Sequence, residues 1–115
     1  MTAAASYNRI AIKRLFRALE ELREVYSDMQ LQTAQVFLII AMNQGITIKE
    51  LMRRTGLAQS SCSRNVNLLS DWVKPEVPGH GLVVTSEDPK ERRRKVVHLT
   101  SKGKELAAIL SDIVH

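Results

Sequence analysis

A cluster of positive charge lies in the last third of this sequence. Five of the six residues from 90 to 95 are cations: Lys90, Arg92, Arg93, Arg94 and Lys95. Largely apolar segments at 82–84 and 96–99 flank the cluster, which predicts a β-hairpin with the cations at its tip. Lys and Arg bind phosphate groups, so this tip suits contact with a polyanion such as DNA. The alternative is a solvated loop whose charges serve solubility and pair with nearby acids.

A second set of polar side chains lies on one face of a helix predicted over about residues 59–72. At about 100° per residue, one narrow face of this helix collects Cys62, Val66, Leu69 and Val73, and is expected to be buried. The opposite face holds Gln59, Ser60, Ser63, Arg64, Asn67 and Ser70. In the major groove Gln and Asn can pair with adenine and Arg with guanine, while small side chains allow close approach. A polar surface helix without a ligand is the alternative.

No catalytic or metal-binding arrangement is recognisable in the sequence. Cys62 is the only cysteine, and the three histidines lack metal-ligand spacing, so neither a metal site nor a cofactor is expected. No Ser–His–Asp, phosphate-loop or paired-carboxylate pattern is seen, so the chain is not expected to be an enzyme. Cys62 itself is expected to be an inert core residue, with a redox sensor as the alternative.

The elements that position these residues follow from apolar spacing and from helix start and stop signals. Amphipathic and nearly continuous apolar patterns predict helices over about residues 6–26 and 33–43. Thr47 and Glu50 form a capping box that begins a short helix, which Gly56 ends. A tight turn then leads into the helix from residue 59, so the segment 47–72 is predicted to be a helix-turn-helix.

The segment that follows contains two prolines and two glycines between residues 74 and 81, and a loop is expected there. Trp72, just before it, is expected to cover the core. The hairpin, or wing, is predicted over about residues 81–99, and a last amphipathic helix over about 100–114. The predicted fold is a single winged helix-turn-helix domain over residues 1–115, mainly α with a small β-hairpin wing.

The order of these elements and two segments resemble the MarR family of winged helix-turn-helix regulators. The segments are GLAQSSCSRNVN (residues 56–67) and DPKERRRKVVHLTSKG (residues 88–103), and the resemblance extends over about residues 33–110. In that family the protein is a dimer, the second helix of the helix-turn-helix reads the major groove, and the wing contacts the minor groove. The resemblance implies contacts to bases or phosphates from Gln59, Ser60, Ser61, Ser63, Arg64 and Asn67.

The resemblance also assigns roles on the wing. Lys90 stands where the family usually has the arginine that probes the minor groove. Arg92 and Arg93 match basic positions that hold the DNA backbone, and Arg94 is expected to contact DNA with them. Asp88 matches an acidic position and is expected to orient an arginine. The connection from the helix-turn-helix into the wing is several residues longer here than in the family.

Dimerisation is expected from two apolar stripes on the terminal helices. They comprise Ile12, Leu15, Phe16 and Leu19 on the first helix and Leu106, Ile109, Leu110 and Ile113 on the last. A domain this small cannot easily bury both stripes, and a two-fold pair offers two reading helices to successive major grooves. The alternative is that the stripes pack only on each other. Because the chain stops at His115, short of the family's last long helix, the resemblance gives no firm expectation of a small-molecule effector.

Composition bounds the remaining possibilities. The chain has 115 residues, a net charge of +5 and 44% hydrophobic residues, as expected for one globular domain with an anionic partner. It has no apolar stretch of membrane-spanning length and no signal-peptide pattern in residues 1–6, so a cytoplasmic location is expected. The predicted function is a homodimeric, sequence-specific DNA-binding transcriptional regulator, specifically a repressor. The alternatives are a protein-interaction winged helix and a DNA-binding protein in replication, partition or mobile-element control.

Overall fold

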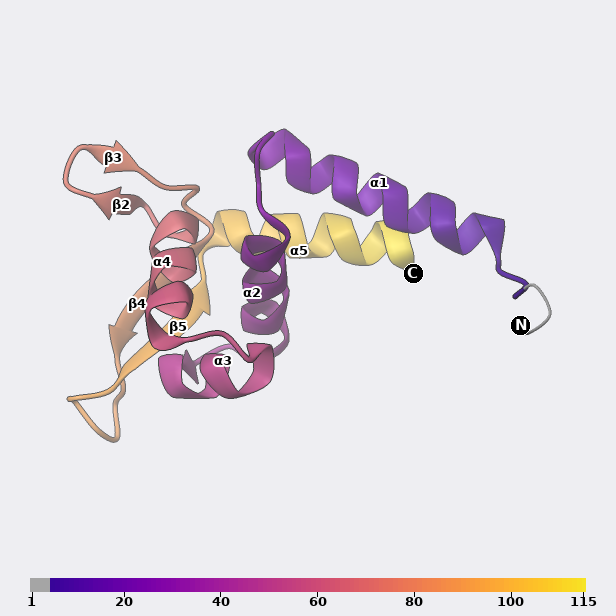
Figure 1. Cartoon of the computed structure of the whole chain (residues 1–115). Coiled ribbons are helices and arrows are strands. Elements are labelled where there is room, and N and C mark those ends of the chain that lie inside the picture. The colour runs from indigo at the N-terminus through magenta and orange to yellow at the C-terminus, as the bar shows by residue number, and fades with distance from the viewer. Residues whose placement is uncertain (1–4) are drawn as a thin grey trace.

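The computed structural model describes residues 5–115 and contains helices and short strands in the order expected of a winged helix (Figure 1). The helices are α1 (Arg9–Val25), α2 (Leu31–Met42), α3 (Ile48–Thr55), α4 (Gln59–Leu69) and α5 (Ser101–Val114). The strands are β1 (Ile46–Thr47), β2 (Trp72–Lys74), β3 (Val77–Pro78), β4 (Val83–Glu87) and β5 (Lys95–Leu99). The predicted fold class, mainly α with a hairpin wing, is confirmed. Within residues 5–115, no helix is long and apolar enough to cross a bilayer.

The molecule has two parts that differ in how well their apolar side chains are covered. In one part α2, α3 and α4 pack together beside the β4–β5 hairpin, and fully buried side chains include Phe37, Ile40, Leu51, Leu69 and Leu82. In the other part α1 and α5 lie side by side and extend away from the rest, as Figure 1 shows. The resulting shape is elongated, 53 × 30 × 23 Å. Most of the fully buried side chains therefore belong to the helix-turn-helix and the hairpin, whereas α1 contributes only Ala18 and Leu22 to the core.

Local capping explains where several elements begin and end. The Thr47 hydroxyl accepts the backbone N–H of Glu50 at 3.1 Å, which is one half of the predicted capping box. The Glu50 carboxylate turns instead to Arg53 and Arg54, so the reciprocal half does not form. Gly56 ends α3 with a left-handed φ of 74°, a conformation that glycine adopts without strain.

The sheet has a third strand that apolar spacing did not predict. β1 pairs antiparallel with β5, with Ile46 opposite Val97 and Thr47 opposite Val96, while β4 pairs with the other edge of β5. A strand of two residues is too short to show an alternating pattern. It ties the start of α3 to the wing, so the first helix of the helix-turn-helix and the hairpin share one sheet.

The helix predicted over residues 59–72 ends earlier, at Leu69. Its last carbonyl groups accept hydrogen bonds from the chain that returns toward β4: His80 N–H donates to Leu68 O at 2.9 Å, and Leu82 N–H donates to Leu69 O at 2.7 Å. Gly79 lies so close to this helix end that a Cβ there would be 2.1 Å from Ser70 O. The returning chain thus takes the acceptors that a longer helix would use.

The expected loop after α4 contains a second, smaller hairpin of β2 and β3, which the proline and glycine content concealed. Trp72 pairs with Pro78 across this hairpin and is 59% exposed. The prediction that Trp72 covers the core is therefore wrong, because the early end of α4 moves this residue outside the helical face that packs inward. Val73, expected on the buried face, is half-buried in β2.

The start of α5 is locked against the start of the wing. Thr100 caps α5 by accepting the Gly103 N–H at 3.1 Å, and it donates its hydroxyl to Gly81 O at 2.7 Å. A Cβ on Gly103 would lie 2.1 Å from Leu82 O, so the helix and the backbone before β4 approach too closely for any other residue.

We expect Gly103→Ala to lower the free energy of unfolding by about 1–3 kcal/mol, because the added methyl group must push α5 away from Leu82. Urea unfolding followed by circular dichroism measures this change. Lys104→Ala, an exposed change in the same helical turn, is the control and should stay within about 0.5 kcal/mol of the unchanged protein. Equal effects of the two substitutions would contradict the close approach.

Candidate nucleic-acid interface

Helix α4 exposes the polar face that the sequence pattern predicted. Gln59, Ser60, Arg64 and Asn67 are exposed, and Ser61, Ser63 and Ser70 are half-buried. The face turned to the core carries Cys62, Asn65, Val66 and Leu69. The predicted contact residues of α4 thus lie on or beside one accessible surface, which contains no acidic side chain between Gln59 and Ser70.

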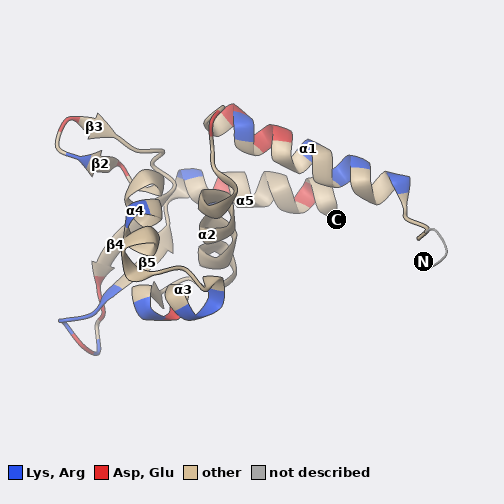
Figure 2. Cartoon of the chain, in the orientation of Figure 1, with Lys and Arg blue, Asp and Glu red and all other residues tan. Residues whose placement is uncertain are grey.

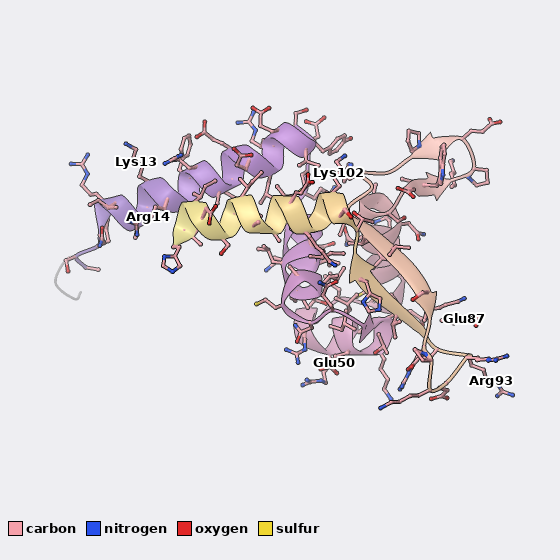
Figure 3. All side chains as sticks on the ribbon, turned by 180° about the vertical axis from the view of Figure 1, so that it is seen from behind. Lys13, Arg14, Glu50, Glu87, Arg93 and Lys102 are labelled. Carbon is pink, nitrogen blue, oxygen red and sulfur yellow. The ribbon has the colours of Figure 1, made fainter. Side chains whose placement is uncertain are left out.

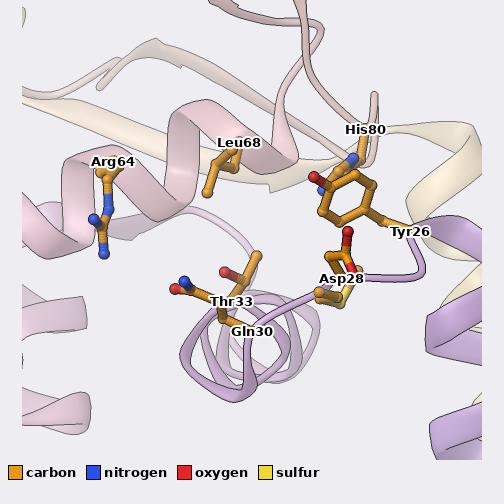
Figure 4. Close-up of a pocket in the computed structure, with 8 residues that line it drawn as sticks. Tyr26, Asp28, Gln30, Thr33, Arg64, Leu68 and His80 are labelled. Atoms are coloured by element: carbon orange, nitrogen blue, oxygen red, sulfur yellow. The ribbon is translucent and has the colours of Figure 1, made fainter.

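Arg64 is the only cation of α4, and its surroundings are shown in Figure 4. It projects beside the start of α2, where it lines an open hollow of about 300 Å³ with Gln30, Asp28 and the neighbouring, mutually tilted rings of Tyr26 and His80. None of the ion pairs formed by residues 5–115 involves Arg64. Its guanidinium group is therefore available to an external ligand.

The wing tip is organised around the buried carboxylate of Asp88. One oxygen accepts the backbone N–H of Lys90 at 2.9 Å, and the other accepts both Nε and Nη2 of Arg94 at 2.8 and 2.6 Å. The Lys90 N–H, with the Arg94 guanidinium second, lowers the pKa of Asp88 from its ordinary value. Asp88 therefore stays ionised at neutral pH and holds the tip in one conformation.

This arrangement divides the five cations of the tip into two groups. Arg94 is held by Asp88 and lies 3.9 Å from Glu91, so much of its charge is compensated within the hairpin. Lys90, Arg92, Arg93 and Lys95 are exposed and form no ion pair within the part of the chain that is described. Figure 2 shows blue segments at the end of the hairpin, and Figure 3 shows Arg93 at its outer edge. The field at the tip comes mainly from these four side chains.

Three more cations lie on α3, and the sequence patterns did not assign them to the site. Lys49, Arg53 and Arg54 are exposed, and in Figure 2 α3 and the wing tip lie along the same lower side of the molecule. Hydrogen bonding to Arg53, with Arg54 adding, lowers the pKa of Glu50 to about 2, so that one carboxylate faces these cations at neutral pH. The sequence could have assigned these cations to the site, because the first helix of a helix-turn-helix crosses the DNA backbone.

The two stripes expected to dimerise are only partly accessible. Ile12, Leu15, Phe16 and Leu19 on α1 are 42–61% exposed, and Ile109 on α5 is 44% exposed. Leu106 and Leu110 are each 6% exposed because they pack into the chain's own core, and Ile113 is half-buried. Leu106 and Leu110 therefore serve the interior of this chain, and the accessible stripe belongs mainly to α1.

The accessible stripe borders an apolar groove of about 450 Å³ between α1, α2 and α5. Leu15 and Leu19 line it from α1, Leu38 and Met42 from α2, and Val114 from α5. Leu38 and Met42 are 41% and 74% exposed, although α2 was predicted to be buried. Apolar side chains on three helices thus form one continuous uncovered surface.

Comparisons with known proteins relate this geometry to one family. Residues 27–72 match the MarR family, and no curated protein sequence matches the chain. A Staphylococcus aureus MepR–DNA complex covers 90% of this chain and 77% of its own, with a TM-score of 0.71 and 18% identity. A mutant of Escherichia coli MarR complexed with operator DNA covers 92% and 71%, with a TM-score of 0.63 and 20% identity. The transcriptional repressor CouR, bound to a 23-mer duplex, covers 90% and 70%, with a TM-score of 0.59 and 27% identity.

Replacing Asp88 by Asn should loosen the wing tip without unfolding the protein. The neutral amide no longer pairs with Arg94, so hydrogen-exchange protection of the Lys90 and Arg94 amides should fall, as measured by NMR. Glu87→Gln, a change of the same kind at an exposed acid of β4, is the control and should leave protection unchanged. Equal protection in both variants would show that Asp88 does not organise the tip.

The same pair predicts a dependence on pH. Since the folded pKa of Asp88 is lowered, its stabilisation is complete above the unfolded carboxyl pKa of about 3.9 and is lost as the pH falls through the lower folded value. Protection at the tip should therefore decrease in the unchanged protein as the pH falls below about 4. The Asp88→Asn variant should lack this step.

Proposed function

This chain carries a MarR-family helix-turn-helix in a winged-helix fold, and from that premise we propose that it is a transcriptional repressor that binds double-stranded DNA sequence-specifically as a homodimer. The observation that carries the proposal is the acid-poor polar face of α4 next to a wing tip with four uncompensated cations. Solved structures of MepR, MarR and CouR with the same fold contain DNA, which supports a duplex as the ligand.

The proposed division of labour follows from the side chains on each element. Gln59, Arg64 and Asn67 have the donors and acceptors needed to read base edges in the major groove, and the serines of α4 permit close approach. Lys90 enters the minor groove, where Arg92 and Arg93 hold the flanking phosphates. The cations of α3 add phosphate contacts on the other side of α4, which fixes its position along the duplex.

In vitro selection from a random duplex library tests the proposal. We expect enrichment of an inverted repeat whose half-sites are about one helical turn, roughly 10 base pairs, apart, because a two-fold dimer offers two α4 helices. Transcription in vitro from a promoter overlapping that site should fall when the protein is added. An absence of binding to any duplex even at low salt would sink the DNA proposal, and increased transcription would contradict the repressor role alone.

Arg64→Ala should reduce discrimination between the selected site and its single-base variants by about 1–3 kcal/mol, because the guanidinium group pairs with a base edge. Binding titrations against a panel of such duplexes measure this loss. Arg23→Ala, an exposed cation on α1, is the matched control and should not change the pattern. If Arg64→Ala weakened binding to every duplex equally, Arg64 would be a phosphate contact.

Lys90→Ala should weaken binding to all duplexes alike and flatten the dependence of affinity on salt. A cation in the minor groove also displaces a counterion, so its loss lowers the slope of log K against log salt concentration by about one unit. The control is Lys13→Ala, which removes the same charge from α1, far from the wing in Figure 3. Equal slopes for the Lys90 variant and the control would remove Lys90 from the interface.

The dimer is supported by the exposed stripe of α1. Ile12, Leu15, Phe16 and Leu19 lie on one face of a helix whose only buried residues are Ala18 and Leu22. Exposed apolar surface of this extent is typical of an interface between subunits. A second copy that packs along α1 and the adjoining groove would cover the side chains that this chain leaves in contact with water.

Leu15→Asp combined with Ile109→Asp should convert the dimer to a monomer, because charge at the centre of an apolar interface is costly to desolvate. Sedimentation at micromolar concentration measures the change. Arg17→Asp, on the opposite face of α1, is the control and should remain dimeric. A monomeric unchanged protein at this concentration would make the dimer proposal wrong while leaving DNA binding to be judged separately.

A further inference from the structure

A buried polar cluster joins α4 to α2 behind the proposed reading surface. Asn65 is fully buried although it lies on α4 directly after the exposed Arg64. The hydroxyl of Thr33, itself 2% exposed, donates to Asn65 Oδ1 at 2.6 Å. Asn65 Nδ2 in turn donates to Ser61 O at 2.9 Å and to Gln32 Oε1 at 3.3 Å. Figure 4 shows Thr33 pointing from α2 toward α4.

Every side-chain polar atom of Thr33 and Asn65 has a partner. No buried side-chain nitrogen or oxygen in residues 5–115 lacks a hydrogen bond, and both N–H groups of the Asn65 amide are used. The bond to Ser61 O fixes the conformation of the Asn65 side chain on its own helix. The bond from Thr33 then fixes that helix relative to α2.

The rest of the contact between these helices is apolar and does not specify rotation in the same way. Cys62, Val66 and Leu69 fill the space beside Asn65, and apolar contacts are non-directional. A hydrogen bond weakens steeply with misalignment, so it restricts the rotation of α4 about its axis. With side-chain tips about 6 Å from that axis, a rotation of about 20° would move them by roughly 2 Å, more than a base contact tolerates.

We propose that Asn65, held by Thr33, is a positioning residue for DNA recognition that sets the rotation of α4 and thereby aims Arg64 and Asn67 at the base edges. The proposal rests on the proposed function. It adds to that function a residue, Asn65, that acts on recognition without touching DNA. Asn65 and Thr33 contribute discrimination between sequences, and the wing and α3 supply the affinity for any duplex.

The test uses the full chain and the double variant Thr33→Val with Asn65→Leu, which replaces both partners by apolar groups of similar shape. Such a replacement is nearly neutral or stabilising for folding, since no buried polar group is left unpaired between the two positions. The ratio of affinities for the selected site and for random duplex should fall about tenfold or more, comparable to a mismatched base pair. Binding to random duplex and its salt dependence should stay unchanged.

Single variants keep the proposal falsifiable if the double variant does not fold. Thr33→Val should lower the ratio of affinities for selected and random duplex. Thr33→Ser, which keeps the hydroxyl, should leave this ratio unchanged. Cys62→Ala is the packing control: it shortens an apolar contact on the same face, so it should lower the melting temperature without changing the ratio.

Two results would overturn the positioning role: a wild-type ratio in Thr33→Val or the double variant, or an equal loss of affinity for selected and random duplex. Failure of the proposed function itself would be seen in the unchanged protein. If it did not distinguish selected from random duplex, the proposed function would be wrong, and this inference with it.

Discussion

The hydrogen bonds between the end of α4 and the chain leading into β4 are the constraint on which the rest of the structure depends. Leu82 N–H binds Leu69 O, and Gly79 fits against the helix end only because it has no side chain. The next residues carry the wing, and Gly103 brings α5 onto the same segment. Helix α4, the wing and α5 are therefore positioned by one short stretch of backbone.

Electrostatics then divides the basic residues by role. Asp88 pairs with Arg94 and so shapes the wing tip, and Glu50 pairs with Arg53 and Arg54. Neither acid therefore contributes a free negative charge at the surface. Among the described residues, Lys90, Arg92, Arg93 and Lys95 at the wing tip and Lys49 on α3 form no ion pair, and α4 itself carries only Arg64. In the proposed function, general attraction to a duplex and selection among sequences thus come from separate elements, which lets sequence preference change without loss of affinity.

The sequence predicted the elements whose signals are local. Thr47, Gly56 and Thr100 carry standard capping chemistry, and the apolar spacing of α4 located its exposed face. Local sequence patterns did not predict features whose hydrogen-bond partners lie far away in the chain. The end of α4 depends on hydrogen bonds from residues 79–82, and β1 exists only through its pairing with β5. Asn65 is polar by type, yet its spacing from Cys62 and Leu69 places it inside, where Thr33 satisfies it.

The most direct test of the account is an NMR titration of the isotope-labelled protein with a duplex carrying the selected site. We expect the amide shifts to concentrate in residues 59–67 of α4 and 88–95 of the wing, with smaller changes in α3 and almost none in α1. A random duplex should shift the wing more than α4. Shifts concentrated in α1, the groove beside it or the β2–β3 hairpin, with α4 unaffected, would contradict the assignment of the DNA-binding surface.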